Sequence, residues 1–222
     1  VHYVFTTILV LFLLGLGVGS LLYRLLLAGR TDPLKLLSRL LLLLAVAVPA
    51  CFALSAYLYS SGHLSLDRYC FKAAALTMAV PTVLMGAVFP VICAAYGPEL
   101  RRAGRRVGTL AALNTAGAVV GALLPAFVFV PLFGVHHSIL LMSGLYLAMG
   151  LILTPMAAPD RRQWVPSGAL GALAVLVIAV SASTDFLRGV FLQRTARLPV
   201  KPEITFWQEG RTATSVVISD RD

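Results

Sequence analysis

The sequence predicts an all-α polytopic membrane protein of about six transmembrane helices, followed by a short C-terminal β-hairpin. Hydrophobic residues make up 59% of the chain and charged residues 12%, whereas a soluble domain has about 45–50% apolar and 25% charged residues. Apolar runs of about 20 residues, the length of helix that crosses a hydrocarbon core of roughly 30 Å, recur along the chain. After the last run the composition changes to alternating threonine, valine, isoleucine and aromatic residues.

Six apolar runs are long enough to cross a membrane, and the last is the weakest. They cover residues 4–27, 40–59, 73–96, 108–133, 137–157 and 167–183. The fourth and fifth runs are joined by Gly-Val-His-His, which predicts a tight helical hairpin. Adjacent histidines such as His136 and His137 can bind a metal ion or haem, but we expect an ordinary polar turn and no metal site, because no second histidine within a helix faces them.

The basic residues lie mainly between the apolar runs, so topology and lipid headgroups explain the net charge of +9 better than nucleic acid does. Alternate loops carry ten Lys and Arg against two. Under the positive-inside rule the ten face the cytoplasm and Val1 starts outside. The cytoplasmic group includes one dense loop, formed by Arg101, Arg102, Arg105 and Arg106. Six crossings then place the tail outside. The six basic residues that follow Asp185 conflict with this placement under the positive-inside rule. Either the tail is extracytoplasmic, or the sixth run does not fully cross.

Small and polar residues interrupt the fourth run on one helical face. Asn114, Gly117, Gly121 and Pro125 follow three- and four-residue steps, so they share a face. Because helices in lipid associate where small residues let their backbones approach closely, we expect this face to meet another helix, with Asn114 hydrogen-bonding across the contact. The alternative is that Asn114 lines a substrate path.

The first run repeats part of this pattern. Gly15-xxx-Gly19-Ser-Leu-Leu matches Gly117-xxx-Gly121-Ala-Leu-Leu, which suggests two three-helix units in opposite orientations. A dinucleotide-binding fingerprint is not expected, because Ser20 occupies the place of its third glycine and a βαβ unit is lacking.

Other residues of the membrane region carry weaker signals. Pro81 and Pro90 in the third run each remove a backbone donor, which favours structural kinks over carbonyls freed for a ligand. The runs contain no Asp or Glu, so a proton- or sodium-coupled pump is not expected. No catalytic constellation can be identified, and the scattered Cys51, Cys70 and Cys93 suggest packing residues.

The chain divides into a membrane domain, residues 1–184, and a tail, residues 185–222. In the tail EITFWQEGRTATSVVIS predicts a β-hairpin that turns at Glu209-Gly210. An isolated two-stranded hairpin is marginally stable. We therefore expect this hairpin to begin a larger soluble domain or to join a protein partner.

Four stretches together resemble the membrane region of the fused family in which a major-facilitator-like helical region precedes a spermidine synthase (polyamine aminopropyltransferase) domain. They are FLLGLGVGSLLYRL at 12–25, PTVLMGAVFPVI at 81–92, GTLAALNTAGAVVGALLPAFVFVPLFG at 108–134 and FWQEGRTATSVVIS at 206–219. Compared with this family, the chain looks truncated at both ends.

The resemblance implies a bacterial inner membrane and aminopropyl transfer from decarboxylated S-adenosylmethionine to a polyamine. The synthase core, with its glycine-rich loop and catalytic aspartate, would lie beyond Asp222, so no cofactor is expected in this chain. The leading hypothesis is a non-enzymatic membrane anchor or subunit. The alternatives are the membrane part of an active aminopropyltransferase, and a facilitator-type half-transporter with substrate near Asn114, Pro81 and Pro90.

Overall fold

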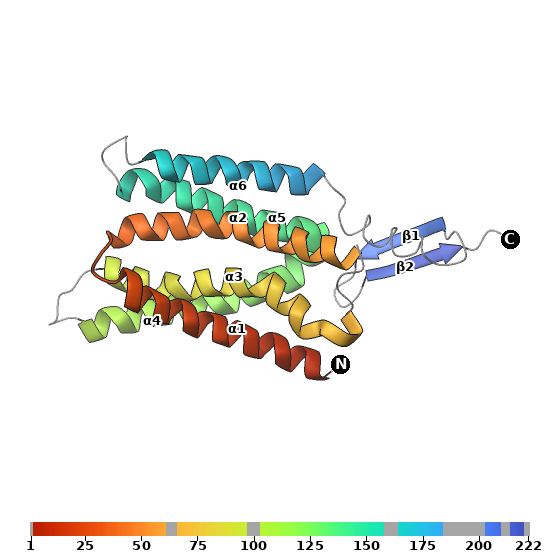
Figure 1. The fold of residues 1–222 in the computed structure, drawn as a ribbon, viewed down its shortest axis with the longest axis horizontal. Helices are drawn as coiled ribbons and strands as arrows, with labels where there is room; N and C mark the ends of the chain where they lie inside the picture. The colour runs from red at the N-terminus through yellow and green to blue at the C-terminus, as the bar shows by residue number, and fades with distance from the viewer. Residues whose placement is uncertain are drawn as a thin grey trace.

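The structure, a computed structural model, is almost entirely helical (Figure 1). It describes residues 2–60, 66–96, 103–157, 164–183, 203–209 and 214–219. The α-helices of this part are α1 (His2–Leu22), α2 (Pro33–Ser60), α3 (Leu66–Ala95), α4 (Ala103–Leu124), α5 (Val130–Ala157) and α6 (Val165–Ser183). Two five-residue π-helices, η1 (Tyr23–Leu27) and η3 (Pro125–Phe129), continue α1 and α4.

Five helical stretches of the described chain are long and apolar enough to cross a membrane. They cover Phe5–Leu27, Pro33–Leu58, Thr77–Ala95, Val107–Ala157 and Val165–Ala182. The fourth has 51 residues and is broken at Gly134, whose φ of 77° and ψ of 170° are not helical. This backbone conformation is readily accessible to glycine alone. The chain reverses there, so that α4 and the long part of α5 after Gly134 run in opposite directions (Figure 1).

The second helix begins earlier than the apolar run predicted. Asp32 caps it: the backbone N–H of Leu34 donates to the Asp32 carboxylate at 3.0 Å, and Pro33 occupies the first helical position. Both features are typical of helix starts. Lys35 and Arg39 therefore lie in the first two turns of α2 and not in a loop. An apolar run marks where a helix enters the hydrocarbon, whereas caps mark where it begins.

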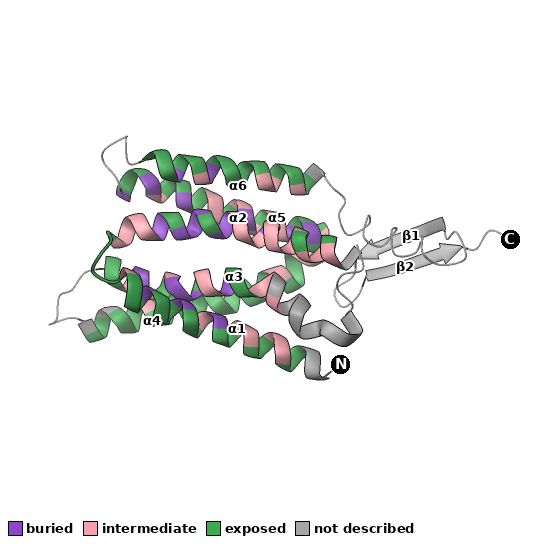
Figure 2. Ribbon diagram, viewed as in Figure 1, coloured by how far each residue is buried: buried purple, intermediate pink, exposed green. Residues whose placement is uncertain are grey.

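Helix α2 is the centre of the bundle. It packs against α3, α5 and α6, while α1 packs against α3 and α5 against α6. Figure 2 shows many of its residues as buried, and Leu42, Leu44 and Ala45 are fully buried. The main apolar cluster joins α2, α3 and the end of the first helix. Its buried members are Tyr23, Leu37, Leu40, Leu41, Ala87 and Val91.

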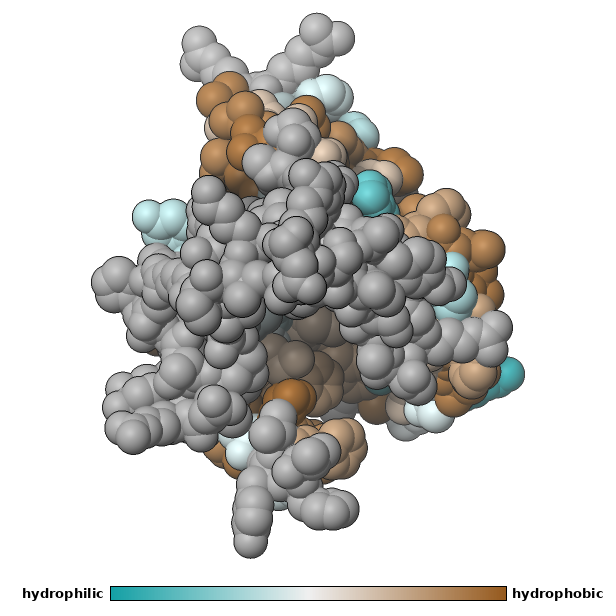
Figure 3. All heavy atoms as spheres, turned by 90° about the vertical axis from the view of Figure 1, so that its right-hand side faces the viewer, coloured by the Kyte–Doolittle hydropathy of each residue, from teal (hydrophilic) through white to brown (hydrophobic). Residues whose placement is uncertain are grey.

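Helix α4 lies at the edge of this bundle. Apart from η3, which continues it, α4 makes no extensive contact with another described element, and all of residues 111–124 are exposed. Most of the described residues that are visible in Figure 3 are hydrophobic. Because lipid tails are themselves apolar, such a surface is compatible with a bilayer.

The tail contains two strands, β1 (Glu203–Glu209) and β2 (Thr214–Ser219). They pair antiparallel, with Glu203 opposite Ser219 and Glu209 opposite Thr214. Gly210 of the expected turn and residues 184–202 lie outside the described residues. The side of the membrane on which the tail lies, and what it joins, stay predictions.

Candidate functional site

Helices α1 and α3 make a close backbone contact. A Cβ built on Gly19 would overlap the carbonyl oxygen of Val83, and one built on Gly15 would overlap the Thr82 side chain. From the other side, a Cβ on Gly86 would overlap the backbone of Leu16. The two backbones therefore touch, which is the arrangement that small residues permit between membrane helices.

The two prolines of α3 lie within a continuous helix. Pro81 is buried beside this contact and Pro90 is half-buried. The hydroxyl of Thr82 lies 2.8 Å from the carbonyl oxygen of Met78 and 3.1 Å from that of Ala79, so it is satisfied within its own helix. The polar group next to Pro81 thus contributes to the helix itself.

The corresponding face of α4 is open. Asn114, Gly117 and Gly121 are exposed, and no described atom lies within 4 Å of a Cβ built on either glycine. The helix that we expected against this face is not supplied by the described residues, and neither is a path around Asn114. The glycine spacing indicates a capacity for close approach, but it carries no information about which helix provides the partner.

The matched sequences of α1 and α4 share a structural feature. Each ends directly before a π-helix: Leu22 precedes η1, and Leu124 precedes η3. The backbone N–H of Ala28 donates to the carbonyl of Tyr23, and that of Val130 donates to the carbonyl of Pro125. Helices α1 and α4 also run in opposite directions (Figure 1).

A buried polar cluster joins α2 to α5. The Ser38 hydroxyl lies 3.0 Å from the carbonyl oxygen of Gly150 and 2.8 Å from the Thr154 hydroxyl, and Thr154 donates to the same carbonyl at 2.9 Å. A Cβ on Gly150 would lie 2.8 Å from the Leu42 side chain, so α2 rests directly on this turn of α5. Sequence reasoning missed the cluster. The available signal was the four-residue spacing of Gly150 and Thr154.

A second polar contact lies where α2, α5 and α6 meet at the other end of the bundle. The Nε2 atom of His136 lies 3.0 Å from the carbonyl oxygen of Ser181, and its ring is 6.4 Å from that of Phe52. His136 is only 8% exposed, whereas His137 is exposed. A small pocket opens beside His136. Its lining residues are Pro49, Phe52, Ala53, His136, Ile139, Leu140 and Ser181.

The prediction of an ordinary polar turn is therefore wrong for His136. The helical geometry of α5 is interrupted at Gly134, and both histidines lie in the first helical turn after this break. Successive helical residues are rotated by about 100°, and this rotation places one imidazole inside the bundle and the next outside. Among the described residues, no group of three or more His, Cys, Asp or Glu is placed to hold a metal ion.

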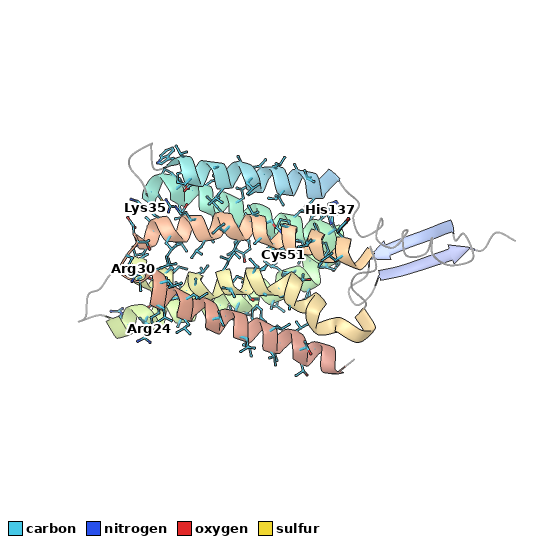
Figure 4. The ribbon with its side chains drawn as sticks, viewed as in Figure 1. Arg24, Arg30, Lys35, Cys51 and His137 are labelled. Atoms are coloured by element: carbon cyan, nitrogen blue, oxygen red, sulfur yellow. The ribbon has the colours of Figure 1, made fainter. Side chains whose placement is uncertain are left out.

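The described basic side chains gather at one end of the bundle. Figure 4 shows Arg24, Arg30 and Lys35 at this end and His137 at the opposite one. Arg105, in the first turn of α4, is exposed. Arg101 and Arg102 lie outside the described residues, and the side chain of Arg106 is not described either. The membrane side of this basic end stays a prediction.

The length and composition of the described helices are compatible with a multi-pass helical membrane protein. Among the described residues, the buried polar side chains bond either within their own helix or across to another one. Comparisons with protein-family models, with curated proteins and with solved structures find no match for the chain.

Proposed function

We propose that the chain is a membrane-anchoring or structural subunit module of a spermidine-synthase-like protein in a bacterial inner membrane. In this role its helices hold the C-terminal tail at the bilayer, where the tail joins a soluble domain or a protein partner. One observation carries the proposal: the hydrogen bonds of the buried polar side chains go to helix backbone or to another helix. Such bonds are made by Ser38, Thr82, His136, Ser138, Ser143 and Thr154.

The distribution of charge favours anchoring over coupled transport. Transporters of this kind use ionisable side chains near the middle of the bilayer. The five described spans contain no Asp or Glu, and their Lys and Arg residues, which are Arg24, Lys35 and Arg39, lie within the first or last turns of a span. These cations can reach lipid headgroups by extending along the helix.

Further features support six passes built as two inverted three-helix units. The break at Gly134 divides the 51-residue stretch into two pieces of more than about 20 residues, and each piece is long enough to cross a bilayer. The matched glycine sequences both end at a π-helix, and opposite directions of α1 and α4 are what inverted repeats require. The basic end of the bundle supports a cytoplasmic location for that end.

Anchoring can be tested with a soluble reporter enzyme fused after Asp222. We expect the fusion to stay in the membrane fraction after an alkaline wash, whereas the reporter alone is released. The same purified chain should form no aminopropylated product from decarboxylated S-adenosylmethionine and a polyamine. Product formation by this chain alone would contradict the proposal, and release of the fusion would contradict the anchoring role.

Transport can be tested separately in proteoliposomes. We expect the reconstituted chain to take up no more labelled polyamine than protein-free vesicles. Uptake that is abolished by Asn114→Leu, in a variant that still inserts normally, would replace the anchor proposal with the half-transporter.

A further inference from the structure

The hydrogen bond of His136 determines which of its ring nitrogens carries a proton. The carbonyl oxygen of Ser181 can only accept, so Nε2 of His136 is the donor in this 3.0 Å contact. A neutral imidazole has one N–H, and Nδ1 is therefore an acceptor. This atom is buried, and no hydrogen-bonding group of the described residues reaches it. Nδ1 of His136 is thus a buried acceptor to which no described group donates a hydrogen bond.

The pocket beside His136 limits what can satisfy this acceptor. It leaves about 10 Å³ for the centre of a water molecule, and one water needs on the order of 10–15 Å³ by this measure. The pocket is lined mainly by apolar residues, and Ser181 is the second polar residue of its lining besides His136.

Helix α2 also has a backbone carbonyl that lacks its helical donor, one turn before the pocket-lining Pro49. Pro49, which lines the pocket, has no N–H, so the carbonyl of Ala45 one turn earlier lacks its usual helical donor. Ala45 is fully buried. In membrane helices such freed carbonyls are satisfied by neighbouring helices, by hydroxyl side chains or by ordered water.

We propose that this pocket is a binding site for one water molecule, which donates a hydrogen bond to Nδ1 of His136 while Nε2–H remains bonded to Ser181. The site joins α2 near Pro49, α5 just after Gly134 and the end of α6. The last carbonyls of a helix have no partner within it. His136 therefore satisfies the end of α6 with one nitrogen and holds the water with the other.

His137 provides an internal control because its tautomer should be the opposite one. Its Nδ1 atom lies 3.1 Å from the carbonyl oxygen of Phe133, which again can only accept. In the neutral form of His137 the proton is therefore on Nδ1 and Nε2 is unprotonated. Two adjacent histidines are expected in different neutral tautomers.

The proposal can be tested by ¹⁵N NMR of the histidine-labelled full chain in lipid nanodiscs, at alkaline pH where free imidazole is neutral. His136→Gln and His137→Gln assign the two rings. For His136 we expect a protonated Nε2, and an unprotonated Nδ1 that receives magnetisation from water; His137 should show the reverse protonation. A protonated Nδ1 on His136, or an unprotonated one without transfer from water, would overturn the proposal.

A matched pair of variants locates the water. Ala53→Val adds two methyl groups to the pocket wall and should abolish the water transfer to His136 while keeping its tautomer. Ala56→Val changes a half-buried alanine of the same helix that does not line the pocket, so it should keep both signals. Unchanged transfer in folded Ala53→Val would place the water elsewhere and refute the site. If Ala53→Val does not fold, the wild-type spectrum decides the question.

Discussion

Helices α1 and α4 carry matched glycine sequences but have different surroundings. In α1 the glycine face lies against α3, so closely that a Cβ on Gly19 would overlap the backbone of Val83. In α4 the equivalent Gly121 meets no described atom within 4 Å. The two faces differ in the helix that lies opposite. In α3, which lies opposite Gly19, the small residue Gly86 is found at the contact. In the α1–α3 contact small residues lie on both helices, and a matching glycine face on one helix alone does not create such a contact.

The largest expected effect comes from filling the packed face. Gly19→Leu places a side chain where the carbonyl of Val83 lies, and this backbone cannot move aside cheaply. We expect the free energy of unfolding to fall by about 3 kcal/mol, or the chain to fail to fold, since overpacking costs roughly 1–3 kcal/mol even where side chains can adjust. SDS-induced unfolding of the purified chain in bicelles measures the change.

Gly17→Leu is the control for this substitution. Gly17 is exposed on the same helix and has nothing within 4 Å of a built Cβ, so its replacement should change the free energy of unfolding by less than about 0.5 kcal/mol. Equal destabilisation by the two variants would show that α1 does not pack through Gly19.

A substitution at the contact between α2 and α5 should lower the free energy of unfolding by less than Gly19→Leu does. Gly150→Ala puts a methyl group 2.8 Å from the Leu42 side chain and 3.2 Å from its backbone nitrogen. Because the side chain can shift in part, we expect a loss of about 1–2 kcal/mol in the same unfolding experiment. Gly144→Ala, on the same helix with nothing within 4 Å, should have little effect. Equal changes in the free energy of unfolding for Gly150→Ala and Gly144→Ala would show that α2 does not pack against α5 at Gly150.

The hydrogen bonds between α2 and α5 should contribute less to the free energy of unfolding than the packing at Gly150 does. Ser38→Ala removes the hydroxyl that joins α2 to Gly150 and Thr154, and interhelical hydrogen bonds in membranes contribute about 0.6 kcal/mol on average and up to about 1.7. Ser143→Ala is a matched control, since this equally buried hydroxyl bonds within its own helix to Ile139. Ser38→Ala should be the more destabilising of the two, and the reverse order would contradict an interhelical role.

Much of the fold could be predicted from composition and run length, because bilayer thickness fixes how long an apolar helix must be. The reversal between the fourth and fifth runs was also visible, in the short segment that contains Gly134. Helix starts were harder to predict. The cap at Asp32 begins α2 several residues before its apolar part, and hydropathy does not register caps.

The contacts within the bundle were less predictable. Gly15 and Gly19 could be identified as packing candidates from spacing, but the spacing could not show that Gly117 and Gly121 would differ from them. The burial of His136 depends on the rotation of α5 after Gly134, which a sequence of two histidines does not specify. Pairings such as Ser38 with Thr154 join residues far apart in the chain, so only the arrangement of the helices brings them together.

The smallest expected effect on the chain itself comes from filling the open face. Gly121→Leu, the counterpart of Gly19→Leu, should change the free energy of unfolding by less than about 0.5 kcal/mol, as an exposed substitution does. In membranes, where a subunit would meet its partner, Gly121→Leu and Asn114→Leu should each reduce the assembly seen by chemical crosslinking, because both change the surface offered to another helix. If Gly121→Leu destabilises the isolated chain as strongly as Gly19→Leu does, then α4 has its partner within this chain, and the two glycine faces are equivalent after all.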